Sequence, residues 1–164
     1  MLDFTLDMAK GMRELSSRGA FLTVKGDGGV NTMTISWGFV GFMWNKPQFI
    51  TVVRPQRYTK EILDSNADSF TVSVPYDGKL KEALDICGTK SGRDIDKSQV
   101  VEFIPSKSTA SPVVAGCDLY YECRINTAQP MDGSLLPEGI AKTFYEDDFH
   151  HFYIGEIVEC YGPK

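Results

Sequence analysis

Short runs of β-branched and aromatic residues, most of them closed by glycine, proline or asparagine, constrain the fold of this chain more than any other feature. Runs of this kind predict β-strands. The predicted strands are residues 20–25, 30–37, 48–53, 69–74, 118–126 and 149–161. A glycine-rich turn at 26–29 joins the first two strands into a predicted hairpin. Strands with short helices between them predict a mainly antiparallel β-barrel covered by small helices.

Three short helices are expected between the strands. The first is indicated by apolar residues that share one helical face, namely Phe4, Met8, Met12 and Leu15. Gly19 is expected to end that helix. Thr59 is the expected N-cap of a second helix at 59–65, and Asp77 caps a third helix that ends at Gly88. The polar residues 90–98 are expected to form a loop.

The composition narrows the class of protein. The chain has 164 residues, of which 42% are hydrophobic and 24% charged, so residues 1–164 are expected to form a single globular domain. A net charge of −5 disfavours nucleic acid as a partner. The apolar stretches are much shorter than the roughly 20 residues of a membrane-spanning helix, and the acidic N-terminus lacks the apolar core of a signal peptide. We therefore expect a cytoplasmic protein that does not contact a membrane.

The cysteines agree with that expectation. They are Cys87, Cys117, Cys123 and Cys160, and no two of them form a C-x-x-C pair. We interpret all four as reduced thiols, because disulfides are rare in the cytosol.

Five sequence motifs go beyond this general description. They are residues 31–38 (NTMTISWG), 44–47 (WNKP), 53–59 (VRPQRYT), 91–94 (SGRD) and 150–156 (HHFYIGE). In this order and spacing, the motifs resemble those of the flavin reductase-like family, especially its flavoredoxin-type members, over residues 20–159. The resemblance implies a six-stranded Greek-key split barrel, a tight homodimer and FMN bound near the subunit interface.

A phosphate-binding site is predicted where a strand leads into the second helix. Arg54, Arg57, Tyr58 and Thr59 lie there. A helix N-terminus offers free N–H groups and a positive dipole end, and a guanidinium matches the oxygens of a phosphate. The alternative interpretation is a solvated helix start. The resemblance favours a phosphate site for FMN.

The resemblance also implies that the strand at 30–37 lies along the flavin, with backbone N–H groups directed at the ring. The residues carried over for this role are Asn31, Thr32, Met33, Thr34 and Ser36. Alternatively, their hydroxyls bond to neighbouring strands. Trp37 packs either on the ring edge or in the core. The loop with Ser91 and Lys97 lies over the flavin or at the dimer interface, or it is a solvated charged loop.

The two histidines, His150 and His151, are adjacent. A histidine on a strand is commonly structural. The family places a histidine five residues before the glycine of the last strand, and here that position is His150, which makes it the candidate catalytic residue near the nicotinamide or electron acceptor. A metal site made by the histidines with Asp147 and Asp148 matches no known spacing, and no metal is expected.

The expected function is that of an NAD(P)H-dependent flavin oxidoreductase that passes electrons through bound FMN to a small molecule or a protein. Hydride transfer to a flavin needs no protein acid or base, so the missing catalytic triad is no objection. One alternative is a flavoredoxin-type electron carrier without nicotinamide activity. Another is a dimeric ligand-binding protein that is not an enzyme.

Overall fold

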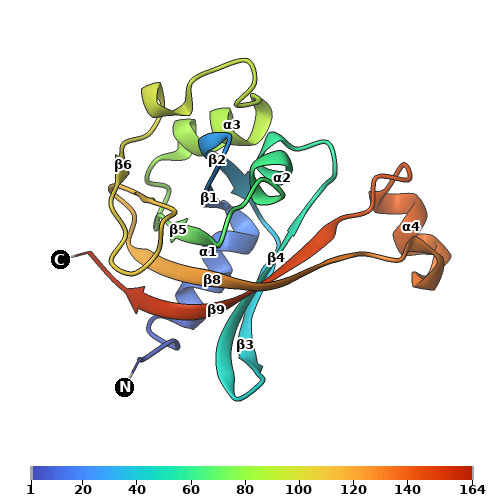
Figure 1. Cartoon of the computed structure of the whole chain (residues 1–164), viewed down its shortest axis with the longest axis horizontal. Coiled ribbons are helices and arrows are strands. Elements are labelled where there is room, and N and C mark those ends of the chain that lie inside the picture. The colour runs from blue at the N-terminus through green and yellow to red at the C-terminus, as the bar shows by residue number, and fades with distance from the viewer. Residues whose placement is uncertain (1, 164) are drawn as a thin grey trace.

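The computed structural model describes residues 2–163, and its centre is a seven-stranded antiparallel sheet (Figure 1). The strand order is β2-β1-β5-β8-β9-β4-β3. The strands are β1 (Ala20–Gly26), β2 (Gly29–Ile35), β3 (Gly38–Met43), β4 (Lys46–Val53), β5 (Ser69–Val74), β8 (Leu119–Pro130) and β9 (His151–Tyr161). β2 and β3 are the two edges, so the sheet is open between them. Two short strands, β6 (Phe103–Ile104) and β7 (Val113–Val114), form a second sheet.

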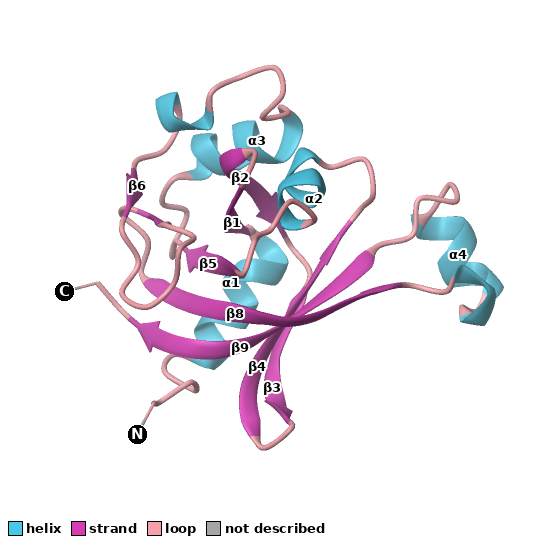
Figure 2. Cartoon of the chain, viewed as in Figure 1, coloured by secondary structure: helices cyan, strands magenta, loops and turns pink. Residues whose placement is uncertain are grey.

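Four α-helices accompany the sheets (Figure 2). They are α1 (Met8–Ser17), α2 (Tyr58–Leu63), α3 (Lys81–Thr89) and α4 (Glu138–Phe144). Short 3-10 helices occupy Lys97–Gln99 and Gly133–Leu135. Figure 2 shows α2 and α3 near β1 and β2, whereas α4 lies far from them, where the long strands β8 and β9 extend away from the rest of the molecule.

The core lies on both sides of β1. Leu22 and Val24 pack in the larger cluster with Phe49, Phe70 and Tyr121. Phe21 packs in a second cluster with residues of α3 and β7. Because side chains alternate across a strand, burial on both faces gives β1 a continuous apolar run instead of an alternating one.

The predicted fold class is confirmed: the molecule is an antiparallel β-protein with a few small helices. All six predicted strands are present, although the sheet has seven strands and not six. The additional strand is β3, whose glycines Gly38 and Gly41 weaken its strand signal. Helix α4 was also not predicted, because none of its residues is buried and it therefore carries no apolar periodicity.

Two predicted helix caps are wrong. Arg57, and not Thr59, occupies the N-cap of α2, because the hydroxyl of Thr59 is engaged by Asn31. Helix α3 begins after Leu80, and Asp77 instead pairs with Lys10 at 3.0 Å. The same helix continues one residue past Gly88.

Two further features bear on the sequence expectations. No helix within residues 2–163 is long and apolar enough to cross a membrane. The four cysteines are free thiols in the structure, and three of them are buried.

Candidate functional site

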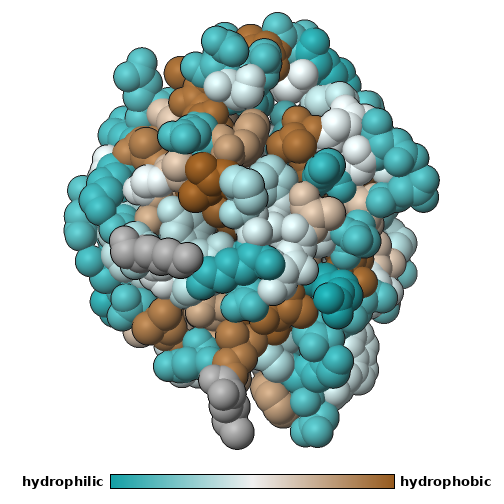
Figure 3. Space-filling model, turned by 60° about the vertical axis from the view of Figure 1, so that its left-hand side comes forward, coloured by the Kyte–Doolittle hydropathy of each residue, from teal (hydrophilic) through white to brown (hydrophobic). Residues whose placement is uncertain are grey.

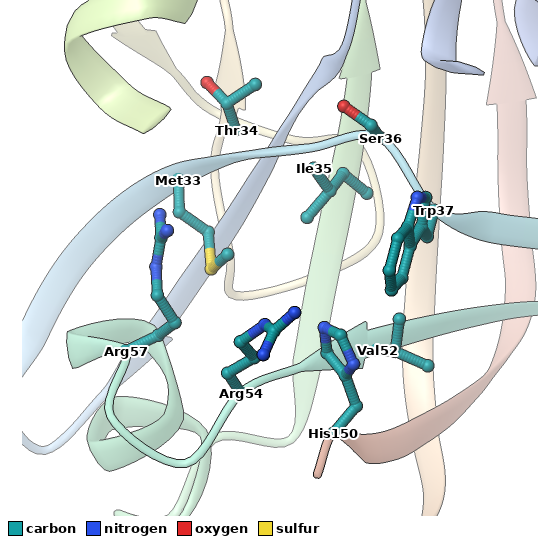
Figure 4. Close-up of a pocket in the computed structure, with 9 residues that line it drawn as sticks. All are labelled: Met33, Thr34, Ile35, Ser36, Trp37, Val52, Arg54, Arg57 and His150. Atoms are coloured by element: carbon teal, nitrogen blue, oxygen red, sulfur yellow. The ribbon is translucent and has the colours of Figure 1, made fainter. Parts of the chain in front are cut away.

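A groove with two connected hollows lies beside β2. The first, which we call the histidine pocket, has a volume of about 190 Å³ (Figure 4). Its lining is Met33, Thr34, Ile35, Ser36, Trp37, Val52, Arg54, Arg57 and His150. The second, the cation pocket, has a volume of about 150 Å³. Its lining is Asn31, Met33, residues 56–59, residues 88–93 and Lys97. The two pockets share Met33 and Arg57 and are therefore continuous.

The cation pocket holds two buried or half-buried positive charges that lack a negative partner, in addition to the exposed Lys90. Lys97 is only 4% exposed, and its Nζ donates to the carbonyl oxygens of Thr32 (3.1 Å) and Cys87 (3.2 Å). The half-buried Arg57 donates from Nη1 to the carbonyl of Gly88 at 3.3 Å. Between residues 2 and 163, neither side chain forms an ion pair with a carboxylate.

Burial without a counter-ion disfavours the charged forms of both residues. It lowers the pKa of Arg57, and it lowers the pKa of Lys97, on which the nearby charge of Arg57 acts in the same direction. A buried charge is normally paired or hydrogen-bonded, since its desolvation is costly. The pocket is therefore built to receive an anion.

The polar wall of the cation pocket is ordered by side chains of β2 and α2. Asn31 Nδ2 donates to Thr59 Oγ1 at 2.9 Å, and both residues are buried. The Thr59 oxygen thus accepts from Asn31 and keeps its own hydrogen for another partner.

The loop at 88–93 closes over this wall. A Cβ at Gly92 would lie 2.1 Å from Asn31 Oδ1, so only glycine allows so close an approach. Arg93 ties the loop to α2 by pairing with Glu61, and its guanidinium lies 5.2 Å from the ring centre of Tyr58.

The free edge of β2 borders the groove. Lys97 binds the carbonyl of Thr32, which shows that this carbonyl points away from β1. Backbone groups two residues apart on a strand point the same way, so those of Thr34 also face the free edge. The hydroxyls are already used: Thr32 Oγ1 donates to the carbonyl of Leu22 (3.2 Å) and Thr34 Oγ1 to that of Leu84 (2.6 Å). Strand β2 therefore presents backbone groups to the groove, whereas the hydroxyls of Thr32 and Thr34 are already hydrogen-bonded elsewhere.

Arg54, in the histidine pocket, has its charge compensated. Its Nη1 donates to Asp148 Oδ2 at 2.6 Å, and its Nη2 donates to the carbonyl of Phe144 at 2.8 Å. Asp148 also accepts from the backbone N–H of Glu146 and from Gln56 Nε2. These hydrogen bonds hold the pKa of Asp148 well below its usual range. Arg54 is thereby fixed between β4 and the segment after α4.

His150 is 7% exposed and lies against Trp37, with ring centres 5.2 Å apart (Figure 4). Its Nδ1 is 2.8 Å from the hydroxyl of Tyr145. Burial first, and then the charge of Arg54, lower the pKa of His150 to about 4, so the ring is neutral at physiological pH. His151 does not line either pocket, as expected for adjacent residues on a strand.

The structure brings nearly all of the predicted site residues together. Those lining the groove are Asn31, Met33, Thr34, Ser36, Trp37, Arg54, Arg57, Tyr58, Thr59, Ser91, Lys97 and His150. Thr32 is the exception, since it contributes only its carbonyl, held by Lys97. Trp37 is 43% exposed and so does not belong to the core. No three His, Cys, Asp or Glu side chains gather as metal ligands within the described part of the chain.

Sequence reasoning missed two kinds of site residue. Gly92 and Arg93 lie inside the motif 91–94, but no role was predicted for either residue. The close approach of Gly92 to Asn31 becomes visible only in the tertiary structure. Tyr145 follows α4 outside every motif, and no local pattern indicates its contact with His150.

An apolar hollow adjoins the histidine pocket. Its volume is about 710 Å³, and it shares Ser36, Trp37 and Val52 with that pocket. Its other lining residues come from α1, β3, β9 and the segments beside α4: Met12, Leu15, Ser16, Gly38, Phe39, Val40, Met131, Tyr145 and Phe152.

Large hydrophobic side chains around β3 and α4 are exposed to solvent, with Phe42 at 62% and Trp44 at 57%. By contrast, hydrophobic residues on the face in Figure 3 lie in separate groups among hydrophilic ones.

The molecule is an open antiparallel β-protein with a groove that contains two cationic side chains, Arg57 and Lys97, and a neutral histidine. The sequence profile described as "Flavin reductase like domain" matches residues 12–164. The chain therefore belongs to the flavin reductase-like family. No curated protein matches the chain.

Solved structures agree with the family. A flavoredoxin from Methanosarcina acetivorans is similar, with 27% identity, a TM-score of 0.69, and 90% of this chain and 69% of that chain covered. A Shewanella frigidimarina protein described as having a split barrel domain has 18% identity and a TM-score of 0.67, over 96% of this chain and 74% of that one. An NADH:FAD oxidoreductase from Streptomyces globisporus has 17% identity and a TM-score of 0.67, over 99% and 86%. The fold is that of the split-barrel flavin reductase-like proteins.

Proposed function

We propose that the chain binds FMN along the groove, with the phosphate in the cation pocket and the ring system in the histidine pocket. The single observation that carries this proposal is the pair Arg57 and Lys97, which lack a carboxylate partner among residues 2–163. A phosphate would supply the missing negative charge and accept from both cations. Membership of the flavin reductase-like family supports a flavin as the ligand that carries this phosphate.

Different residues of the groove would hold different parts of the cofactor. Arg57, Lys97, Thr59 and Ser91 would hold the phosphate, and the free edge of β2 would hold the ring by its backbone. Met33 and Trp37 offer the ring apolar and aromatic contact in the histidine pocket. When bound, the flavin supplies the redox chemistry, and this chain supplies binding, orientation and electrostatics.

We infer that the protein is an NAD(P)H-dependent flavin oxidoreductase. The apolar hollow beside His150 leaves room for a second ligand next to the flavin site. A structural neighbour is named as an NADH:FAD oxidoreductase, although at 17% identity this similarity supports only the fold. The second candidate is an electron carrier without nicotinamide activity, favoured by the 27% identity to a protein named as a flavoredoxin.

A homodimer and a cytoplasmic location complete the proposal. Large apolar side chains are exposed at two places, Phe39, Phe42 and Trp44 on and beside β3, and Ile140 and Phe144 on α4, and exposed apolar patches commonly mark interfaces. A second copy of the chain would cover this surface and close the open side of the histidine pocket. The four free cysteines suit a reducing compartment.

The test is the visible spectrum of the purified protein before and after addition of NADH or NADPH. A yellow protein that bleaches with the nicotinamide supports the reductase. Bleaching only with dithionite supports the carrier. Extraction of the cofactor followed by chromatography should identify FMN, and a colourless protein that fails to bind added FMN would overturn the proposal. Light scattering of the flavin-bound protein should give the mass of a dimer.

A further inference from the structure

The contact between Tyr145 and His150 joins two segments that close one side of the histidine pocket. Tyr145 follows α4, and its hydroxyl lies 2.8 Å from Nδ1 of His150, which immediately precedes β9. The phenol ring also packs at a tilt against Phe149, with ring centres 4.8 Å apart, and lies 5.0 Å from the guanidinium carbon of Arg54. Contacts of the ring with Phe149 and Arg54 and of the hydroxyl with His150 therefore hold Tyr145 in place.

The direction of this hydrogen bond follows from the chemistry of its partners. Burial raises the pKa of Tyr145, and burial and Arg54 lower that of His150, so both groups are neutral at physiological pH. The charged groups that face the imidazole are Arg54 and Asp148, and they pair with each other. A phenol is a good donor and a poor acceptor, whereas the unprotonated nitrogen of an imidazole is a good acceptor. This chemistry favours donation from the Tyr145 hydroxyl to Nδ1.

This hydrogen bond sets the position of the single N–H proton on the neutral imidazole of His150. With Nδ1 accepting, the hydrogen must sit on Nε2, because the bond made by one ring nitrogen sets the state of the other. Figure 4 shows the outer end of the imidazole directed between Arg54 and Trp37, into the pocket. No described residue forms a hydrogen bond with Nε2. This N–H is thus available to a ligand.

We propose that Tyr145 is a positioning residue that locks His150 in the tautomer with its proton on Nε2. The histidine pocket then presents a neutral hydrogen-bond donor, which selects ligands with a carbonyl-type acceptor at that point and gives no charge attraction to an anionic group. The identity of the ligand rests on the proposed function, but the tautomer is a property of this chain alone.

The test is nitrogen NMR of the imidazole rings in protein labelled with ¹⁵N-histidine, at pH 7 and without flavin. The chain has only two histidines, so His151 serves as an internal control. In the wild type, His150 should carry its proton on Nε2. In Tyr145→Phe, which keeps the aromatic ring and removes the hydroxyl, the ratio of the two His150 tautomers should fall by about 2- to 12-fold, which is the effect of one neutral hydrogen bond.

The matched control is Tyr58→Phe, the same substitution in the cation pocket, which should leave the His150 tautomers unchanged. A wild-type His150 with its proton on Nδ1 would overturn the proposal without any variant. So would an unchanged tautomer ratio in Tyr145→Phe.

Titration with FMN separates this inference from the proposed function. If FMN fails to bind the wild type while the tautomer shift occurs, the proposed function fails and the role of Tyr145 stands. If FMN binds but leaves the Nε2 proton resonance in place, the selection of a carbonyl-type acceptor by His150 is wrong.

Discussion

Arg54 and Arg57 lie three residues apart after the same strand, yet the fold treats their charges in opposite ways. Arg54 meets a carboxylate, Asp148, brought from 94 residues away in the chain. Arg57 donates to the carbonyl of Gly88, forms no ion pair among residues 2–163, and shares its pocket with a second buried cation, Lys97. One arginine therefore has a carboxylate partner within the fold, and the other has none among residues 2–163, which is why we propose that it binds the phosphate.

The comparison teaches that an arginine beside a pocket indicates an anion site only when its own partner is missing. Asp148 accepts hydrogen bonds from three donors, Arg54, Gln56 and the backbone N–H of Glu146, so the charges of Arg54 and Asp148 compensate each other. In the cation pocket, the charges of Arg57 and Lys97 would be compensated only by an added anion. Three predictions of ligand affinity, from the largest expected effect to the smallest, and one prediction of stability test this difference.

Arg57→Ala should weaken FMN binding most. A hydrogen bond to a charged group contributes roughly 1.5–3 kcal/mol, which corresponds to about 10- to 150-fold in the dissociation constant. Riboflavin, which lacks the phosphate, should bind the wild type and Arg57→Ala almost equally. Quenching of flavin fluorescence measures both ligands, and an equal loss for riboflavin would make Arg57 a structural residue like Arg54.

Lys97→Met should separate binding from stability. The variant should bind FMN about tenfold more weakly, because it loses a charged donor in the phosphate site. Denaturant unfolding of the flavin-free protein should show no loss of stability, since a buried uncompensated charge is costly and an apolar side chain of similar length relieves that cost. If the flavin-free protein instead loses more than about 2 kcal/mol, the bonds of Lys97 to Thr32 and Cys87 are its main role.

Arg54→Ala should weaken FMN and riboflavin by the same small factor, because Arg54 already has a partner. The ratio of the two affinities should equal that of the wild type. Asp148→Asn is the matched control, since it removes the same ion pair from the other side. A loss specific to FMN would show that Arg54 leaves Asp148 to bind the phosphate.

The titration of His150 acts on the free energy of unfolding and not on ligand affinity. Its pKa of about 4 lies below the usual value of 6.5, so between these two pH values the unfolded chain binds more protons than the folded one. Stability should therefore fall as the pH falls from about 6.5 to about 4 and receive no further change from this group below that. Proton NMR of the imidazole should give the low pKa in the wild type and a higher one in Arg54→Ala, which removes a positive charge.

The pKa of His151 is lowered too, so His151→Gln is the control that isolates the His150 contribution to this pH dependence. If His151→Gln alone removes the pH dependence, the histidine that governs it is the one outside the pocket.

The local part of the fold was predictable from the sequence. β-branched runs and turn residues indicate six of the strands, because strand propensity and glycine turns act over a few residues. The motifs also indicate a ligand site beside residues 31–37 and a short helix after Arg57, although its N-cap was placed at Thr59, two residues too late. Two missed elements, β3 and α4, have mostly exposed side chains, and surface segments carry little hydrophobic pattern. The other two missed strands, β6 and β7, have two residues each and are too short to show an alternating pattern.

The sequence by itself determined the antiparallel β-class, the family and the set of residues around the groove. Tertiary structure alone decided what each of them does there. Thr32 turns its hydroxyl toward β1, Thr59 accepts from Asn31 instead of capping α2, and Tyr145 reaches His150. Tertiary structure also decided which of the two arginines, Arg54 and Arg57, pairs with a carboxylate. The physical reason is that hydrogen bonds and ion pairs depend on distances of a few ångströms between segments far apart in the chain, and no local pattern encodes those distances.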